Sequence, residues 1–333
     1  MKQYKVGIIG AGAIVESSHL PVLKTLAGAE PAWIYDINIR RKEVLSSMYN
    51  VRAIDENELA AAIGSVDICL LTIPYGVRSS YIRMIADAQK ALYVEKPFAL
   101  SVKEHNEYCS MFEPYKLAVG FQRREYASVQ ALSAIVSSGI FGRLNKITFQ
   151  QGNFTLKGGT GYLSDAKLSA GGVIIESAIH TLDQLLLITA ATGVSLNKLT
   201  SLSKNGIDYD SVFTSGLHTE TGGIETECRV STLRNLDNGI KFFFDNAIAE
   251  TNTSPENLIK VTGIYKTVNN FSISPYQSDL NVSGARSVAQ SFAFFWERFM
   301  EGIEKKEVNI TSGVKSVLIT DWMEQIYNKI HNN

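Results

Sequence analysis

The stretch VGIIGAGAIVESSHLP, residues 6–21, joins a short apolar run to a pair of glycines and then to a segment with helical spacing. Gly10 permits a tight turn after a strand, and Gly12 lets backbone amides at the start of a helix approach a pyrophosphate. The third position of such a glycine pattern is usually small, but Val15 occupies it here. The stretch predicts a strand–turn–helix unit that binds a dinucleotide, although the glycines by themselves are also compatible with a purely structural turn.

Short apolar runs alternate with helical segments through the first 120 residues. The runs YKVGIIG, PAWIYD, VDICLLTIP, ALYVEKP and KLAVGF predict strands buried on both faces of a sheet. Helical spacing predicts helices at residues 19–26, 40–49, 56–62, 77–88 and 102–111. This alternation is typical of an α/β domain with a doubly wound parallel sheet, which we expect over residues 1–121.

The pattern changes in residues 122–333. The segments RLNKITFQQGNF, GIETECRVSTL, GIKFFFD, LIKVTGIYKTV and FSISPY predict strands separated by turn residues, and two helices with apolar stripes end the chain. These features predict an α+β domain around a largely antiparallel sheet. A chain of 333 residues also exceeds what one hydrophobic core usually organises, which favours two domains.

Composition excludes several classes of protein. With 32 basic and 33 acidic side chains the formal charge is -1, which offers no field for binding nucleic acid or an anionic membrane. Cys69, Cys109 and Cys228 lie far apart, so we expect neither a disulfide framework nor a metal site. The first residues lack the unbroken apolar stretch of a signal peptide, and no apolar run reaches the roughly 18 residues that span a membrane. We therefore expect a cytoplasmic protein.

Asp36 closes the second predicted strand, at the distance from the glycines where an acidic residue binds the adenosine ribose. A carboxylate there would repel a 2′-phosphate, which favours NAD. Arg40 and Arg41 lie close enough in the sequence to keep NADP open. The alternative role for Asp36 is a helix cap or a turn residue.

The stretch YVEKPFAL, residues 93–100, places three non-apolar residues where a strand ends. Ligands of parallel sheets bind at the carboxyl ends of the strands, so Glu95 and Lys96 are expected at the functional edge. Pro97 favours an extended conformation for Lys96. A lysine held there can donate to a substrate oxygen; the alternative is a solvated loop lysine.

Glu176, His180 and Asp183 interrupt an almost entirely apolar helical segment, residues 171–188. Their spacings of four and three residues predict that all three project from one helical face. Because buried charge needs partners, these side chains are expected either to line a cavity or to form a satisfied buried network. The spacing leaves both possibilities open.

Together, GAGAI with HLP, EKPFAL, GFQRR and GGVIIESAIHTLD resemble the glucose–fructose oxidoreductase and inositol dehydrogenase family (Gfo/Idh/MocA) over about the first 190 residues. The resemblance implies an amino-terminal Rossmann domain that binds NAD or NADP and a second domain whose open sheet often forms an oligomer interface. A sugar or polyol substrate would bind between the domains, and a homodimer or homotetramer is expected.

The resemblance also implies roles for individual residues. His180 would be the general base with Glu176 as its partner, Lys96 would contact the reacting hydroxyl, and hydride would pass between nicotinamide and a ring carbinol. The expected substrate-binding residues are Asp183, Arg124, Lys157 and Tyr162. The expected cofactor-binding residues are Gly10, Gly12, Ala13, Ile14, Asp36, Arg41, Thr72, Pro74, Glu95, Lys96 and Gln122.

Several positions depart from the family pattern. Members commonly have asparagine and histidine where this sequence has Tyr75 and Arg78, and many have aspartate in place of Glu176. Arg78 is expected either to meet an anionic group or to lie on a helix surface. Two alternatives to a dehydrogenase stay open: an NAD-dependent glycosidase that oxidises its substrate transiently, and a non-catalytic dinucleotide-binding regulator.

Overall fold

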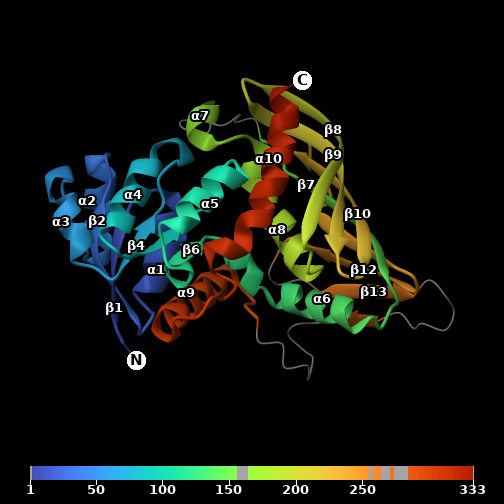
Figure 1. Ribbon diagram of the computed structural model, residues 1–333, viewed down its shortest axis with the longest axis horizontal. Helices are drawn as coiled ribbons and strands as arrows, with labels where there is room; N and C mark the ends of the chain where they lie inside the picture. Colours follow the sequence, from blue (N-terminus) through green and yellow to red (C-terminus); the bar gives the residue numbers. More distant parts are fainter. Residues whose placement is uncertain (1, 156–163, 255–257, 264–270, 274–283, 333) are drawn as a thin grey trace. The chain divides into compact units, whose positions relative to one another are not determined.

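The computed structural model describes residues 2–155, 164–254, 258–263, 271–273 and 284–332, and the chain forms two compact units (Figure 1). Unit 1 comprises Met1–Gln122 and Ala289–Val317, and unit 2 comprises Arg123–Val288 and Leu318–Asn333. The sequence predicted two continuous domains, residues 1–121 and 122–333, which would place 289–317 in the second domain. The packing of one late helix explains why this segment belongs to unit 1.

Unit 1 contains a parallel sheet with the strand order β3-β2-β1-β4-β5-β6 among its described residues. Its strands are β1 (Tyr4–Ile9), β2 (Ala29–Tyr35), β3 (Arg52–Ala53), β4 (Ile68–Leu71), β5 (Ala91–Val94) and β6 (Leu117–Val119). Its helices are α1 (Leu20–Leu23), α2 (Ile39–Tyr49), α3 (Leu59–Gly64), α4 (Ser79–Asp87), α5 (Val102–Ser110) and α9 (Val288–Lys305). The predicted doubly wound α/β sheet is confirmed.

Helix α9 completes the core of unit 1. Its buried face carries Phe292, Phe295, Trp296 and Phe299, which follow helical spacing and join the same core cluster as Tyr93 of β5. Trp296 and Tyr93 have ring centroids 4.6 Å apart. Burying one such side chain contributes roughly 1.5–3 kcal/mol, so this stripe holds the late helix against the parallel sheet.

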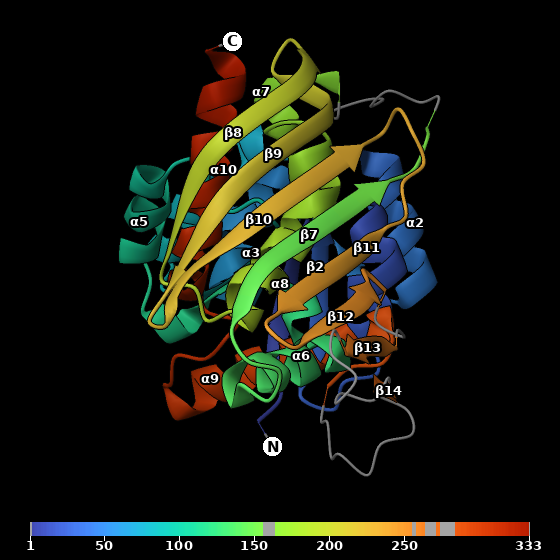
Figure 2. The same cartoon turned by 90° about the vertical axis from the view of Figure 1, so that its right-hand side faces the viewer.

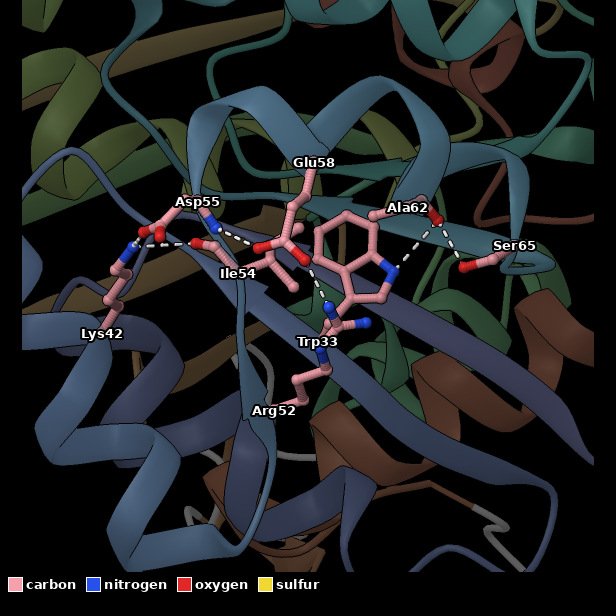
Figure 3. A network of polar contacts seen from close by, with 8 residues as sticks. All are labelled: Trp33, Lys42, Arg52, Ile54, Asp55, Glu58, Ala62 and Ser65. Atoms are coloured by element: carbon pink, nitrogen blue, oxygen red, sulfur yellow. Dashed lines mark hydrogen bonds and ion pairs between the residues drawn. The ribbon is translucent and has the colours of Figure 1, made fainter.

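A polar network fixes the edge of this sheet near β3 (Figure 3). The Lys42 ammonium is buried, donates to the Ile54 carbonyl at 2.8 Å and pairs with the Asp55 carboxylate. The indole of Trp33 donates to the Ala62 carbonyl at 3.1 Å, which ties β2 to α3. The partners of Lys42 account for a buried charge that would otherwise destabilise the domain.

Unit 2 contains an eight-stranded sheet in its described residues, with the order β14-β13-β12-β11-β7-β10-β9-β8. The β7–β10 pair is parallel and the other pairs are antiparallel, so the predicted, largely antiparallel sheet is confirmed. The strands are β7 (Leu144–Gly152), β8 (Gly193–Lys204), β9 (Ile207–Thr219), β10 (Gly222–Ser231), β11 (Gly239–Phe244), β12 (Ala247–Asn252), β13 (Ile259–Gly263) and β14 (Phe271–Ile273). The sequence did not predict β8, β9 and β12, because polar residues interrupt their apolar runs.

Helices cover one face of this sheet, and Figure 2 shows the other face without a helix of the described chain over it. Unit 2 contains α6 (Ala127–Ser138), α7 (Ala166–Ser169), α8 (Ile179–Ile188) and α10 (Val317–His331). The Trp322 indole of α10 donates to the Ser215 hydroxyl of β9 at 3.0 Å. The uncovered face carries charged pairs, including Lys146 with Glu227 at 3.0 Å.

One helical stretch of the described chain, Ala166–Ile188, is long and apolar enough to cross a membrane by length and composition. Within this structure 78% of its apolar window is buried. Burial inside unit 2 is the ordinary reason for such a composition in the core helix of a globular domain.

Candidate functional site

The glycine turn after β1 has the geometry that a dinucleotide requires. Gly10 has a φ of +110°, and a Cβ there would lie 2.4 Å from Oγ1 of Thr72, so any larger residue is excluded. A Cβ on Gly12 would meet nothing within 4 Å, which leaves open space above the turn. The turn therefore combines a constrained first glycine with room beside the second.

The helix that follows the turn begins at Ala13 and widens into a π turn over Val15–His19. N–H groups in the first turn of a helix have no intrahelical acceptor, so the amides of Ala13 and Ile14 suit an anion. Val15, the residue that breaks the glycine pattern, is fully buried in the core of unit 1. Open space beside exposed helix amides fits the pyrophosphate of a dinucleotide.

Asp36 follows β2 and holds the glycine turn. Its carboxylate accepts from the Ala11 N–H at 2.6 Å and from the Asn38 N–H at 2.7 Å. Arg41 of α2 donates from Nε to the Ala11 carbonyl at 3.1 Å and from NH2 to Glu16 at 2.8 Å. Asp36 and Arg41 thus bind the two ends of one residue in the turn.

Lys96 follows β5, and a buried network holds the glutamate before it. Glu95 Oε1 lies 3.0 Å from Nε2 of His19, whose Nδ1 accepts from the Trp296 indole at 3.2 Å. Since Nδ1 accepts, the tautomer with the proton on Nε2 donates to Glu95. His19 is fully buried, so this network fixes the main chain immediately before Lys96.

Arg78 binds the main chain on both sides of Lys96. Its NH1 donates to the carbonyls of Glu95 and Pro97, each at 2.5 Å, and NH2 donates to the carbonyl of Ile73 at 2.7 Å. Arg78 is 3% exposed, so the helix-surface position expected as one alternative is wrong. The guanidinium binds backbone carbonyls because a planar fork of donors matches converging acceptors.

The predicted cofactor residues follow strands that are neighbours in the sheet. Gly10 follows β1, Thr72 follows β4, Lys96 follows β5 and Gln122 comes after β6, and these strands are adjacent in that order. The carboxyl ends of parallel strands lie at one edge, where open α/β sheets bind their ligands. In the described chain, Oε1 of Gln122 is buried without a hydrogen-bond partner, so it suits a donor on a ligand.

In unit 2, Arg124 and Asp183 bind each other. Nε of Arg124 donates to Oδ2 of Asp183 at 2.7 Å, and NH2 donates to Oδ1 at 2.5 Å. Burial raises the pKa of the Asp183 carboxyl, and the neighbouring Arg124 guanidinium opposes that rise. The structure therefore brings together two residues that the sequence assigned separately to substrate binding.

His180 lies on α8, directly after a π turn over Ile174–Ala178. His180 and Asp183 are buried, whereas Glu176 in the π turn is exposed. The common face expected for the three side chains remains a prediction.

The start of this helical segment is anchored by Asp208 of β9. Its buried carboxylate accepts from the N–H groups of Gly172 and Ile174 at 2.8 and 3.0 Å and from the Tyr327 hydroxyl at 2.6 Å. Burial raises the pKa of Asp208, while these hydrogen bonds oppose the rise. Asp208 thereby fixes the segment that leads to His180.

Some site residues were predicted and others were missed. Lys157 and Tyr162 lie outside the described residues. Pro74 follows β4 with Thr72, near the same strand end. Arg78 and Asp208 were not predicted as anchors, because the sequence gives no sign that their partners lie nearby.

Comparisons with known proteins agree with this geometry. A family model described as "Oxidoreductase family, NAD-binding Rossmann fold" matches residues 4–122. The matching model is that of the Gfo/Idh/MocA oxidoreductases, so residues 4–122 are similar to that family. Unit 1 therefore has the NAD-binding Rossmann fold of that family, and the predicted resemblance is confirmed.

The curated relatives include proteins named as dehydrogenases of a glucoside and of inositol. A D-glucoside 3-dehydrogenase of Escherichia coli is 23% identical over 205 residues, which are 61% of this chain and 58% of the relative. An inositol 2-dehydrogenase of Rhizobium meliloti is 28% identical over 220 residues, 62% of this chain and 63% of the relative. These alignments span less than two thirds of either relative.

The fold is shared over the whole length with a solved structure. An aldose–aldose oxidoreductase from Caulobacter crescentus superposes with a TM-score of 0.83 at 15% identity, covering 99% of this chain and 98% of that chain. At this identity the likeness shows the fold. Both units of the chain therefore follow the architecture found in that oxidoreductase.

Proposed function

We propose that this protein is an NAD-dependent dehydrogenase or reductase that transfers hydride between nicotinamide and a ring carbinol of a sugar, a cyclic polyol or a sugar derivative. The observation that carries the proposal is the edge of the unit 1 sheet, where the glycine turn, Thr72 and Lys96 follow adjacent strands β1, β4 and β5. A turn that can bind a dinucleotide, beside a lysine that can stabilise charge on an alcohol oxygen, suits hydride transfer from a carbinol.

The chemistry assigned to the chain is proton transfer and charge stabilisation. When bound, the nicotinamide accepts or supplies the hydride. His180 would take the hydroxyl proton as general base, and Lys96 would stabilise negative charge on the oxygen. Glu176 would assist His180. The residues that would bind the substrate are Asp183, Arg124, Lys157 and Tyr162.

NAD is favoured over NADP by the carboxylate of Asp36 after β2. A ribose 2′-hydroxyl can donate to this carboxylate, whereas a 2′-phosphate would be repelled. Ile37, the next residue, is 84% exposed and offers an apolar surface to an adenine ring. These features support a site for the adenosine half of NAD.

Absorbance of reduced nicotinamide tests the function directly. Purified protein is incubated with NAD+ or NADP+ and a panel of polyols, aldoses, glycosides and nucleotide sugars, beside Lys96→Ala and His180→Ala. Stoichiometric formation of reduced cofactor by the wild type, lost in both variants, supports the proposal. Release of a free sugar from a glycoside with no net change in nicotinamide would instead assign the protein to the glycosidases.

We also propose that the chain works in the cytoplasm as a homodimer or homotetramer. The uncovered face of the unit 2 sheet supports this, because its charged pairs, such as Lys241 with Glu250 at 2.6 Å, can re-pair across an interface. Light scattering at two salt concentrations tests it, and a monomer at micromolar concentration would contradict it.

A further inference from the structure

An ion pair stands beside the glycine turn. Glu16, in the π turn after the glycines, accepts from NH2 of Arg41 at 2.8 Å. The Tyr49 hydroxyl of α2 donates to the Glu16 carbonyl at 3.1 Å, which fixes the backbone of this residue. Both ionic side chains are a little over one third exposed, so a ligand in solution can reach them.

The same arginine is tied to the residue that Asp36 holds. Asp36 accepts from the N–H of Ala11, and Arg41 donates to its carbonyl. The carboxylate expected to meet the adenosine ribose and the guanidinium that would suit a 2′-phosphate are therefore linked through one residue, Ala11. Charge around this part of the turn is decided by Asp36, Glu16 and Arg41 together.

NAD and NADP differ only in the 2′-phosphate, which carries a charge between about -1.5 and -2 near neutral pH. Two carboxylates and one guanidinium, those of Asp36, Glu16 and Arg41, sum to a formal charge of -1. A phosphate that recruited Arg41 would separate it from Glu16 and leave an unpaired carboxylate beside the new anion. This cost is absent for NAD.

We propose that Glu16 is a specificity-determining residue that occupies Arg41 and thereby makes the dinucleotide site select NAD over NADP. The inference rests on the dinucleotide site of the proposed function and is independent of its substrate. Asp36 repels the 2′-phosphate of NADP. Glu16 pairs with the Arg41 guanidinium, which would otherwise be available to bind that phosphate. Removing the Glu16 charge alone should therefore convert Arg41 into a phosphate ligand.

Isothermal titration calorimetry with NAD+ and NADP+ tests this inference without any substrate. The proteins compared are the wild type, Glu16→Gln, the double variant Glu16→Gln/Arg41→Ala, and Glu43→Gln. Glu43 is an exposed residue of α2, so its replacement controls for the loss of one negative charge. Circular dichroism melting shows whether each variant is folded.

The wild type should bind NAD+ more tightly than NADP+. Glu16→Gln should strengthen NADP+ binding by roughly fivefold while leaving NAD+ within about twofold, the scale expected for one partly exposed charge. Glu43→Gln should leave both affinities unchanged, and the double variant should lose the gain for NADP+.

Three results would overturn the inference. They are a wild type that prefers NADP+, equal gains in Glu16→Gln and Glu43→Gln, and a gain that persists when Arg41 is also removed. The last would attribute the effect to reduced repulsion or to Arg40. A wild type that binds neither dinucleotide would refute both this inference and the cofactor assignment, whereas NAD-selective binding without turnover would count against the dehydrogenase proposal alone.

Discussion

Arg124 and Asp183 form a two-point ion pair that is almost fully buried: the arginine is 5% exposed and the aspartate 2%. Arg124 lies in the short helical turn Gln122–Glu125, and Asp183 lies on α8. Because each carboxylate oxygen accepts from the guanidinium, the pair holds the first residues of unit 2 against the helix that carries His180. Substitution of either residue is therefore expected to affect both the turn Gln122–Glu125 and helix α8.

Replacing Asp183 with asparagine should strongly destabilise unit 2. The substitution removes the carboxylate charge that pairs with the buried Arg124 guanidinium, a loss expected to cost about 3 kcal/mol or more. Urea unfolding followed by circular dichroism measures the change in the free energy of unfolding. Asp237→Asn, which removes an exposed carboxylate, should change it by less than about 0.5 kcal/mol.

The double variant Arg124→Met/Asp183→Leu separates stability from function. Apolar side chains of similar size should recover most of the lost stability, because neither buried charge remains. Any loss of turnover that persists in this stable protein belongs to the polar pair itself. Equal stability of Asp183→Asn and the wild type would show that the Arg124–Asp183 ion pair does not stabilise unit 2.

The stability of unit 1 should decrease as the pH falls from about 6.5 to about 4. Burial lowers the pKa of His105 to about 4 from its ordinary value of 6.5, although its hydrogen bond to the Gly313 carbonyl opposes the shift. The unfolded chain therefore binds the proton first, so stability is complete above pH 6.5 and is lost on acidification. The shift corresponds to at most about 3 kcal/mol.

Unfolding free energies measured between pH 4 and 8 test this expectation. In His105→Asn the unfolding free energy should depend less on pH between 4 and 6.5, even if the variant is less stable at neutral pH. An unchanged dependence of the unfolding free energy on pH in this range would rule out His105 as its source.

Arg78→Gln should impair catalysis more than cofactor binding. The variant loses donors to the carbonyls on both sides of Lys96, so the ammonium is displaced, and a displacement of about 1 Å can cost on the order of a hundredfold in rate. We expect kcat to fall by roughly tenfold to a hundredfold, with KM changed much less.

The control for Arg78, which is the N-cap residue of α4, lies on that helix. Arg83 of α4 is exposed and pairs with Glu107 at 2.6 Å, so Arg83→Gln should leave kcat unchanged. Arg78→Lys keeps the positive charge and an ammonium donor group but loses the planar fork, so it should recover part of the activity. If Arg78→Gln raised KM for NAD+ and left kcat intact, Arg78 would be a cofactor ligand instead of a positioning residue.

The two glycines of the turn should respond differently to alanine. Gly10→Ala should destabilise the protein by about 1–3 kcal/mol, since its positive φ and the contact with Thr72 both disfavour a Cβ. Gly12→Ala has space for the Cβ and should fold normally, yet bind NAD+ more weakly because the methyl group occupies the approach to the turn. Thermal melting and calorimetry distinguish the two effects. Normal NAD+ affinity in Gly12→Ala would show that the pyrophosphate does not bind next to this glycine.

Local sequence patterns were sufficient to predict the strand–turn–helix unit, the acidic residue after β2 and the lysine after β5. Each depends on residues within one strand or turn, where periodicity and the steric freedom of glycine act directly. The strands β8 and β9 were not predicted because polar residues interrupt their apolar runs. In β9 even buried positions are polar, with Asp208, Ser211 and Ser215 among them.

The sequence by itself thus determined most of the helices and strands of unit 1, although not the short strand β3, and which chemical groups end its strands. Only the tertiary structure decided which groups meet: His19 with Glu95, Arg78 with the carbonyls around Lys96, and Arg124 with Asp183. It also decided that α9 packs against the sheet of unit 1. The physical reason is that periodicity records how apolar each face of a segment is, whereas the choice of neighbour depends on shape and charge complementarity between segments far apart in the chain.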